Sequence, residues 1–406
     1  MQLTARPHRF RAGVALLFAC ALAATSCGSD TEAATPTVDL TQLDVGGYAT
    51  LPRDIGEPKN TDVPRFVEAQ RLGNVMPLPV EIDPKLVYQP PGTVRPFLLP
   101  DEAHSSPIHR WIKEDNFAAD AKGFVSGFSA TGQSNKVNSI AYTLSTSVLI
   151  FPDTKSATDA AANLSRAGFY DDDEYPVEPA KLDKYPAAHV RWQPGGQVLA
   201  SWLAKDEFVI VTIASDYESK VLGESNLPGM SALAEKAIAA TSTALDKFEP
   251  TPPDQFMQTS IDPDGLRSIS LRRPEGDSFL NVPGTYDLHG SLHFPTDPLA
   301  RKQELEDAGV DRVAYDAGEL YRAADAESAQ ELKDKSSELS RYFRSADSPK
   351  GLPQATCMEY VGPAAGAIRF YCHVAYDRYY AFMGAEQLLD AQQRISAQYA
   401  ILANSE

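Results

Sequence analysis

The sequence predicts an α+β protein of two similar halves, each a mostly antiparallel sheet covered by helices, after a signal peptide and flexible tether. Three observations predict it. An apolar run opens the chain, a plan of strands and helices recurs at an offset of roughly 171 or 172 residues, and an amphipathic helix ends each half.

The first 26 residues have the form of a signal peptide. Arg6, Arg9 and Arg11 supply positive charge, and residues 12–24 are apolar. A run of about 13 residues is too short to cross a bilayer but suits the hydrophobic region of a signal peptide. We therefore expect export to the extracytoplasmic side of the cell membrane.

Small residues precede Cys27 at the end of this apolar run. The arrangement resembles the lipobox of bacterial lipoproteins, whose cysteine receives a diacylglycerol and becomes the new N-terminus. The resemblance implies a lipid anchor on Cys27, with acyl chains such as palmitate, and residues 27–37 form a flexible tether. Ala24 stands where leucine is usual, so Cys20, ordinary cleavage and a retained anchor stay as alternatives.

The chain carries a formal charge of −18, and residues 1–26 contain no carboxylate. The exported body is therefore strongly acidic and repels nucleic acid and anionic lipid headgroups. We expect no nucleic-acid partner, and we expect contact with the membrane through the N-terminal lipid alone.

The mature chain divides into a first α+β domain, residues 38–248, and a second, residues 266–406. The linker between them, residues 249–265, begins with the proline-rich run Glu-Pro-Thr-Pro-Pro-Asp. Helices are expected on one face of each sheet, and two such sheets can form a cleft between them.

The repeat is most visible where a strand leads into a helix. Strand 147–151 precedes Asp153, which suits a helix N-cap, and strand 319–322 precedes Asp325 in the same way. Hairpins follow in both halves, and their matched segments are 189–203 with 357–374 and 205–211 with 376–382. We interpret this constant offset as an internal duplication.

A fainter match precedes the main repeat. Residues 45–48 and a helix over 64–72 resemble residues 282–286 and a helix over 298–308. On that alignment, residues 84–140 are an insertion in the first domain.

Two cysteines lie outside the signal segment. Cys357 and Cys372 fall in two predicted strands joined by a Gly-Pro turn, and the midpoint between them lies in that turn. In an oxidising compartment this pattern predicts a disulfide across a hairpin. A metal pair with His373 is the alternative, but these ligands make a poor tetrahedral site, and we expect no metal or other cofactor.

Several short motifs resemble uncharacterised cell-envelope lipoproteins of mycolate-bearing actinobacteria. They lie at 43–48, 68–72, 293–298, 308–314 and 320–325. The resemblance covers most of the mature chain and implies an envelope lipoprotein built on a domain of unknown function. It supplies no catalytic residue.

No familiar catalytic motif is present. The sequence lacks Gly-x-Ser-x-Gly, Ser-x-x-Lys, His-Glu-x-x-His and a phosphate-binding loop. His289 and His293 would share a face of a strand, although a partly exposed strand followed by a helix cap at Asp297 explains them better than a metal site. We assign no catalytic residue.

An aromatic and basic group on the last strands is the candidate ligand face. Tyr and Arg side chains on an open sheet face can bind a glycan, a peptide or a lipid headgroup. Alternation predicts Tyr376, Arg378 and Tyr380 on one face, with Tyr379 on the other. The candidate ligand residues are Arg369, Tyr371, Tyr376, Arg378 and Tyr380.

Three functions stay open. We favour a non-enzymatic envelope lipoprotein that binds an envelope glycan, lipid or protein. The first alternative is a hydrolase or transferase that acts on envelope polymers through acidic residues, because paired carboxylates need no sequence motif. The second is a structural accessory subunit of an envelope complex.

Overall fold

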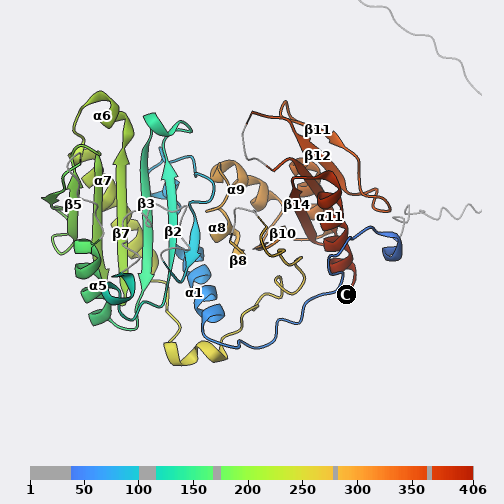
Figure 1. Cartoon of the computed structure of the whole chain (residues 1–406), viewed down its shortest axis with the longest axis horizontal. Helices are drawn as coiled ribbons and strands as arrows, with labels where there is room; N and C mark the ends of the chain where they lie inside the picture. The colour runs from blue at the N-terminus through green and yellow to red at the C-terminus, as the bar shows by residue number, and fades with distance from the viewer. Residues whose placement is uncertain (1–37, 100–115, 168–174, 278–281, 364–367, 406) are drawn as a thin grey trace, which may run out of the picture. The chain divides into compact units, whose positions relative to one another are not determined.

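The computed structural model describes residues 38–99, 116–167, 175–277, 282–363 and 368–405. The predicted signal peptide, Cys27 and nearly all of the tether lie outside these ranges. The described residues form two seven-stranded antiparallel sheets with helices, which confirms the predicted α+β class (Figure 1).

The first half contains β1 to β7 and the helices around them. In chain order the elements are η1 (Leu40–Gln42), α1 (Asp62–Val75), α2 (Pro79–Ile82), β1 (Arg95–Phe97), α4 (Phe117–Asp120), β2 (Ser126–Gln133), η4 (Asn138–Ile140), β3 (Tyr142–Ile150), α5 (Thr154–Ala167), β4 (Glu178–Ala180), β5 (His189–Gln193), β6 (Val198–Lys205), β7 (Phe208–Asp216), α6 (Tyr217–Leu222) and α7 (Leu227–Leu245).

The second half contains β8 to β14. After the linker helix η5 (Pro253–Gln258), the elements are β8 (Gly284–Asp287), α8 (Leu288–Ser291), α9 (Pro298–Asp307), β9 (Arg312–Tyr315), β10 (Gly318–Arg322), α10 (Ala326–Ser336), β11 (Phe343–Ala346), β12 (Thr356–Tyr360), β13 (Phe370–Tyr376), β14 (Tyr379–Ala385) and α11 (Leu388–Ala403).

The two sheets have the same strand order. The first runs β1-β2-β3-β7-β6-β5-β4, and the second runs β8-β9-β10-β14-β13-β12-β11. Each strand of one sheet therefore has a counterpart at the same place in the other, which is the arrangement that a duplication produces.

Local details repeat along with the topology. Asp153 accepts a hydrogen bond from the backbone of Ser156, and Asp325 accepts one from Ser328, so both predicted helix caps are present. Asp206 and Asp377, which occupy the tight turns of the last hairpins, both have positive φ, at 52° and 45°.

Helices cover both faces of each sheet, whereas we expected them on one face. In β7, Val209 and Val211 pack in the cluster that contains α5, while Phe208 and Ile210 pack in the cluster that contains α7. Apolar side chains that point both ways along a central strand require cover on both sides, so the strand reads as a continuous apolar run rather than an alternating one.

Residues 84–140 differ from the expected insertion. They contain β1 and β2, which occupy in the first sheet the positions of β8 and β9 in the second. The matched helices also differ, because α1 precedes β1 whereas α9 follows β8. Strands β1, β8 and β9 are short, and the sequences of the two halves differ here, so the sequence did not reveal this equivalence.

Residues 39–56 begin the first half in sequence but bind to the second half, and we call them the strap. Tyr48 donates its hydroxyl to Asp390 in α11 at 2.6 Å, and Asn404 donates to the carbonyl of Thr50 at 2.9 Å. Arg53 forms an ion pair with Asp316 at 2.7 Å.

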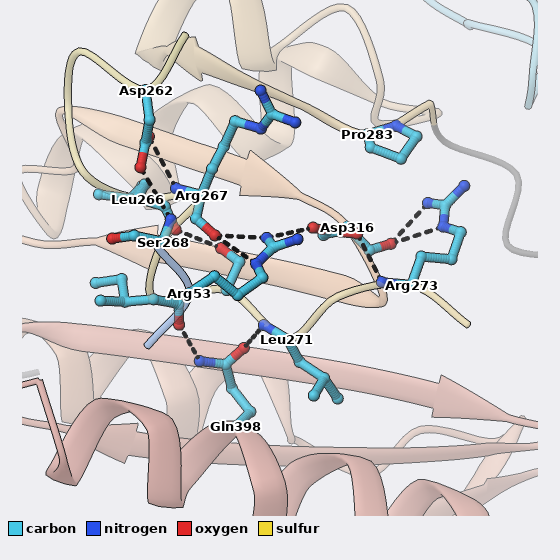
Figure 2. Close-up of polar contacts among 12 residues, drawn as sticks. Arg53, Asp262, Leu266, Arg267, Ser268, Leu271, Arg273, Pro283, Asp316 and Gln398 are labelled. Atoms are coloured by element: carbon cyan, nitrogen blue, oxygen red, sulfur yellow. Dashed lines mark hydrogen bonds and ion pairs between the residues drawn. The ribbon is translucent and has the colours of Figure 1, made fainter. Parts of the chain in front are cut away.

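Asp316 is the centre of the polar network that fastens the strap (Figure 2). Its carboxylate binds Arg53 and accepts a hydrogen bond from the backbone N–H of Arg273, and its main-chain carbonyl accepts one from the Arg273 guanidinium. Arg53 also donates to the carbonyl of Arg267, and Gln398 of α11 binds the backbone at Leu271. The Asp316 carboxylate therefore joins the strap to the segment that leads into the second sheet, and neighbouring hydrogen bonds connect that segment to α11.

Helix α1 contacts strands of both sheets. It packs on β2 and on β8, where Gln70 donates to the carbonyl of Pro283 at 3.2 Å and Asn74 accepts from the backbone of Asp287. The two halves are thus connected by side chains as well as by the linker.

Candidate functional site

The expected ligand face divides between the two sides of the second sheet. Tyr376 ends β13 and pairs directly with Tyr379, which begins β14. Only Asp377 and Arg378 lie between them, so the turn reverses the chain and Tyr380 points to the face opposite Tyr376. Tyr371 and Tyr380 share that opposite face, while Tyr376 packs against Tyr399 of α11 at 5.2 Å.

Both arginines of the predicted group have partners within the protein. Arg369 forms an ion pair with Glu359 on the neighbouring strand at 2.7 Å, and Arg378 donates to the carbonyl of Ala323 at 2.9 Å. Both guanidinium groups therefore have structural partners.

The predicted disulfide joins Cys357 and Cys372 at directly paired positions of β12 and β13. It is confirmed, and it ties the two strands together beside His373.

His289 and His293 lie in and after the short helix α8 instead of on a strand. His289 contacts Glu81 at 3.2 Å and His293 contacts the carbonyl of Met76 at 3.1 Å, so both rings face the first half. Within the described ranges, no group of three His, Cys, Asp or Glu side chains is arranged to hold a metal ion.

A cavity of about 450 Å³ lies in the second half, between the sheet and helices α9 and α10. We call it the Arg301 pocket. Its volume is in the range of small-molecule sites. The lining residues are Phe294, Pro295, Arg301, Glu304, Tyr315, Glu319, Tyr321, Lys335, Ser336, His373, Tyr380 and Phe382.

Four side chains of this pocket form a column, in which three groups stack and the fourth, His373, meets the edge of its neighbour. The Arg301 guanidinium lies 4.8 Å from the ring centre of Tyr321, which stacks on Tyr380 at 5.2 Å. Tyr380 in turn lies parallel to His373 at 6.0 Å. Tyr321 and Tyr380 are directly paired across β10 and β14, so the sheet register sets the spacing of the column.

The polar atoms of the column are held by neighbours. Tyr321 donates its hydroxyl to Glu319, and the Tyr380 hydroxyl pairs with Nδ1 of His373 at 2.8 Å. His373 is 3% exposed, and its Nε2 has no partner among the described residues. A buried polar atom on a pocket wall is a place for a ligand hydrogen bond.

Burial sets the protonation of these groups. It lowers the pKa of His373 to about 3, with Lys333 and Arg301 adding to the effect, so the imidazole is neutral at physiological pH. Burial also raises the pKa of Glu319 and raises those of Tyr321 and Tyr380 far above their ordinary values. The tyrosines are therefore hydrogen-bonding phenols and poor nucleophiles.

The charges of the pocket are balanced. Arg301 forms an ion pair with Glu304 at 2.8 Å and donates to Ser336 at 3.3 Å. Lys335 adds one further basic group and Glu319 one further acidic group. The pocket therefore offers many hydrogen-bond donors and acceptors without a strong net charge.

The same place in the first half is filled by apolar side chains. Trp202 pairs with Val211 in the first sheet as His373 pairs with Phe382 in the second. Trp202 is fully buried in the α5 core, together with Leu149, the counterpart of Tyr321. Sequence reasoning missed the pocket, although alignment of the halves would have shown a histidine opposite a buried tryptophan.

Comparison with known families identifies both halves. A model described as "Domain of unknown function (DUF7373) N-terminal" matches residues 55–261, and its C-terminal counterpart matches residues 267–405. The chain belongs to the DUF7373 family. The two matches agree with the two-domain architecture of the fold.

No curated protein matches this DUF7373 chain. Among solved structures, it is similar to the extracellular domain of PknH from Mycobacterium tuberculosis. The identity is 11%, the TM-score is 0.28, and the match covers 44% of this chain and 97% of that domain. In the described part of the chain, no helix combines the length and apolar character needed to span a bilayer.

Proposed function

We propose that this DUF7373 protein is an exported, lipid-anchored envelope protein that binds a small polar ligand in the Arg301 pocket. The observation that supports binding is the unpaired, buried Nε2 of His373 on the wall of a polar cavity. The sequence of residues 12–27 supports export and lipid attachment at Cys27.

Substitution of His373 by Trp tests the binding site. The first half accommodates Trp at this position, so the variant should fold while its indole fills the cavity. We expect an extract of cell-envelope small molecules to raise the melting temperature of the wild-type protein by a few degrees and to leave His373→Trp unchanged. His189→Trp, at an exposed first-half position, is the matched control.

The binding proposal is wrong if the extract stabilises wild type and His373→Trp equally, or stabilises neither. Near-ultraviolet circular dichroism of the free variants establishes that both retain native packing.

The anchor is tested separately by mass spectrometry of the mature N-terminus. Full-length protein from a host that processes lipoproteins should begin at Cys27 and carry diacylglycerol. Cys27→Ala should be released from the membrane fraction. An unmodified Cys27, or a chain that starts elsewhere, contradicts the proposed anchor.

A second candidate function is glycoside hydrolysis. Two carboxylates line the Arg301 pocket: Glu319, whose pKa is raised by burial, suits a general acid, and Glu304 is the ion-pair partner of Arg301. Turnover of chromogenic glycosides that falls by about 100-fold in Glu319→Gln would favour catalysis. Absence of turnover in the wild-type protein would exclude these substrates.

A further inference from the structure

We propose that the ligand of the Arg301 pocket is a neutral saccharide, bound at one site per chain. This inference rests on the proposed ligand-binding function and specifies its chemical class.

Charge is the first argument. Arg301 and Glu304 neutralise each other at 2.8 Å, and the remaining lining charges are one lysine and one glutamate. An anionic ligand would meet the glutamates, and a cationic ligand would meet the arginine and lysine. A neutral ligand avoids both desolvation and repulsion of a net charge.

The aromatic rings supply the second argument. Arg301 and Tyr380 stack on opposite sides of Tyr321, so the faces of Tyr321 are covered and a flat aromatic ligand cannot enter between these three groups, while His373 meets the edge of Tyr380 through their hydrogen bond. Their polar edges and the neighbouring carboxylates provide donors and acceptors in many directions. A sugar ring, whose hydroxyls both donate and accept, matches such a set.

The apolar lining gives the third argument. Phe294, Pro295 and Phe382 line the same cavity, so part of its wall is apolar. Saccharides have the complementary character, since their hydroxyls lie around the ring edge while the C–H groups form apolar faces. A cavity of about 450 Å³ holds one or two sugar rings.

The first half predicts the stoichiometry. Trp202 and Leu149 fill the place of His373 and Tyr321, and both are completely buried. Among the described residues, the corresponding place in the first half therefore offers a saccharide no such cavity.

Matched sugars that differ only in charge test the class. The probes are glucose, glucuronic acid and glucosamine, the corresponding galactose set, and their neutral disaccharides. We expect a 1:1 complex with at least one neutral sugar, measured by calorimetry or ligand-observed NMR, with charged counterparts about tenfold weaker. Its Kd should not change between low and physiological salt, because no net charge is paired.

Variants assign the binding to this pocket. His373→Trp should abolish binding, and Glu319→Ala should weaken it by about tenfold. Glu327→Gln and His189→Trp, both at exposed positions, should bind like the wild-type protein. Retention of binding in His373→Trp, with its native fold verified, would place the sugar elsewhere and overturn the proposal.

The outcomes distinguish the neutral-saccharide proposal from the proposed ligand-binding function on which it rests. If envelope extract stabilises only the wild-type protein but binding requires a charged ligand, the neutral-saccharide class is wrong and the pocket function stands. If neither extract nor sugars bind, the pocket function fails as well.

Discussion

Two buried histidines contribute to the dependence of this protein's stability on pH. Burial lowers the pKa of His293, like that of His373, to about 3, compared with an ordinary value of 6.5. His289, 6.0 Å from His293, has the opposite shift because its hydrogen bond with Glu81 raises its pKa. Although the two rings are neighbours, the neutral form is therefore favoured for His293 and the protonated form for His289.

The sign of the pH effect follows from these shifts. His293 and His373 stabilise the fold above pH 6.5, and their contribution is lost as the pH falls from 6.5 towards 3. His289 stabilises the fold below pH 6.5, and this stabilisation is lost as the pH rises through the pKa of His289 in the folded protein.

We expect the free energy of unfolding to fall by about 1 to 2 kcal/mol per pH unit just below pH 6.5, since the two lowered histidines outweigh the raised one. His373→Gln should remove roughly half of this slope when measured by urea denaturation. His189→Gln, at an exposed site, should leave the slope unchanged, and an equal slope in His373→Gln would contradict the assignment.

At the scale of elements, the tight hairpin turns decide which side chains share a face. Asp206 and Asp377 both have a left-handed backbone at the first position after a strand. Asp tolerates this conformation better than alanine does, and glycine adopts it without a steric cost. The turn at Asp377 is what places Tyr380 in the Arg301 pocket and Tyr376 against α11.

Asp206→Ala and Asp377→Ala should each lower the free energy of unfolding by about 1 kcal/mol, and the glycine variants should lie close to the wild type. Denaturant midpoints of the four variants check this prediction. Alanine variants as stable as the glycine variants would show that backbone conformation is not the cause.

Much of the element plan was predictable from the sequence, because the duplication repeats local signals. The caps at Asp153 and Asp325 and the hairpin that carries Cys357 and Cys372 all depend on short-range rules. The relation of Tyr376 to Tyr380 was mispredicted, because alternation was continued through a two-residue turn. The pocket was missed since its walls come from α9, α10 and several strands that are distant in sequence.

In the whole molecule, the second half depends on the strap, which lies at the N-terminal end of the first half. The second family match begins at residue 267. Asp316 lies within it, yet the ion-pair partner of Asp316 is Arg53, which lies far outside it. The second half therefore repeats the topology of the first half, but its contacts make it depend on the strap.

Arg53→Ala should reduce the free energy of unfolding of the 38–406 protein by about 2 to 3 kcal/mol, because Asp316 loses a charged partner. Lys59→Ala, at an exposed position nearby, is the control. A fragment of residues 267–406 alone should show little cooperative unfolding in circular dichroism. A native-like transition in that fragment would show that the strap is dispensable.

The strap also sets an order of events during synthesis. Tyr48 is made early, but its partner Asp390 belongs to the last helix, so the hydrogen bond between them can form only when the chain is nearly finished. The part of the strap around Tyr48 and Thr50 therefore lacks its partners until the C-terminal residues are made, whereas Arg53 can already bind Asp316. A stop codon shortly before α11 would remove that helix and also the partners that hold the N-terminal part of the strap.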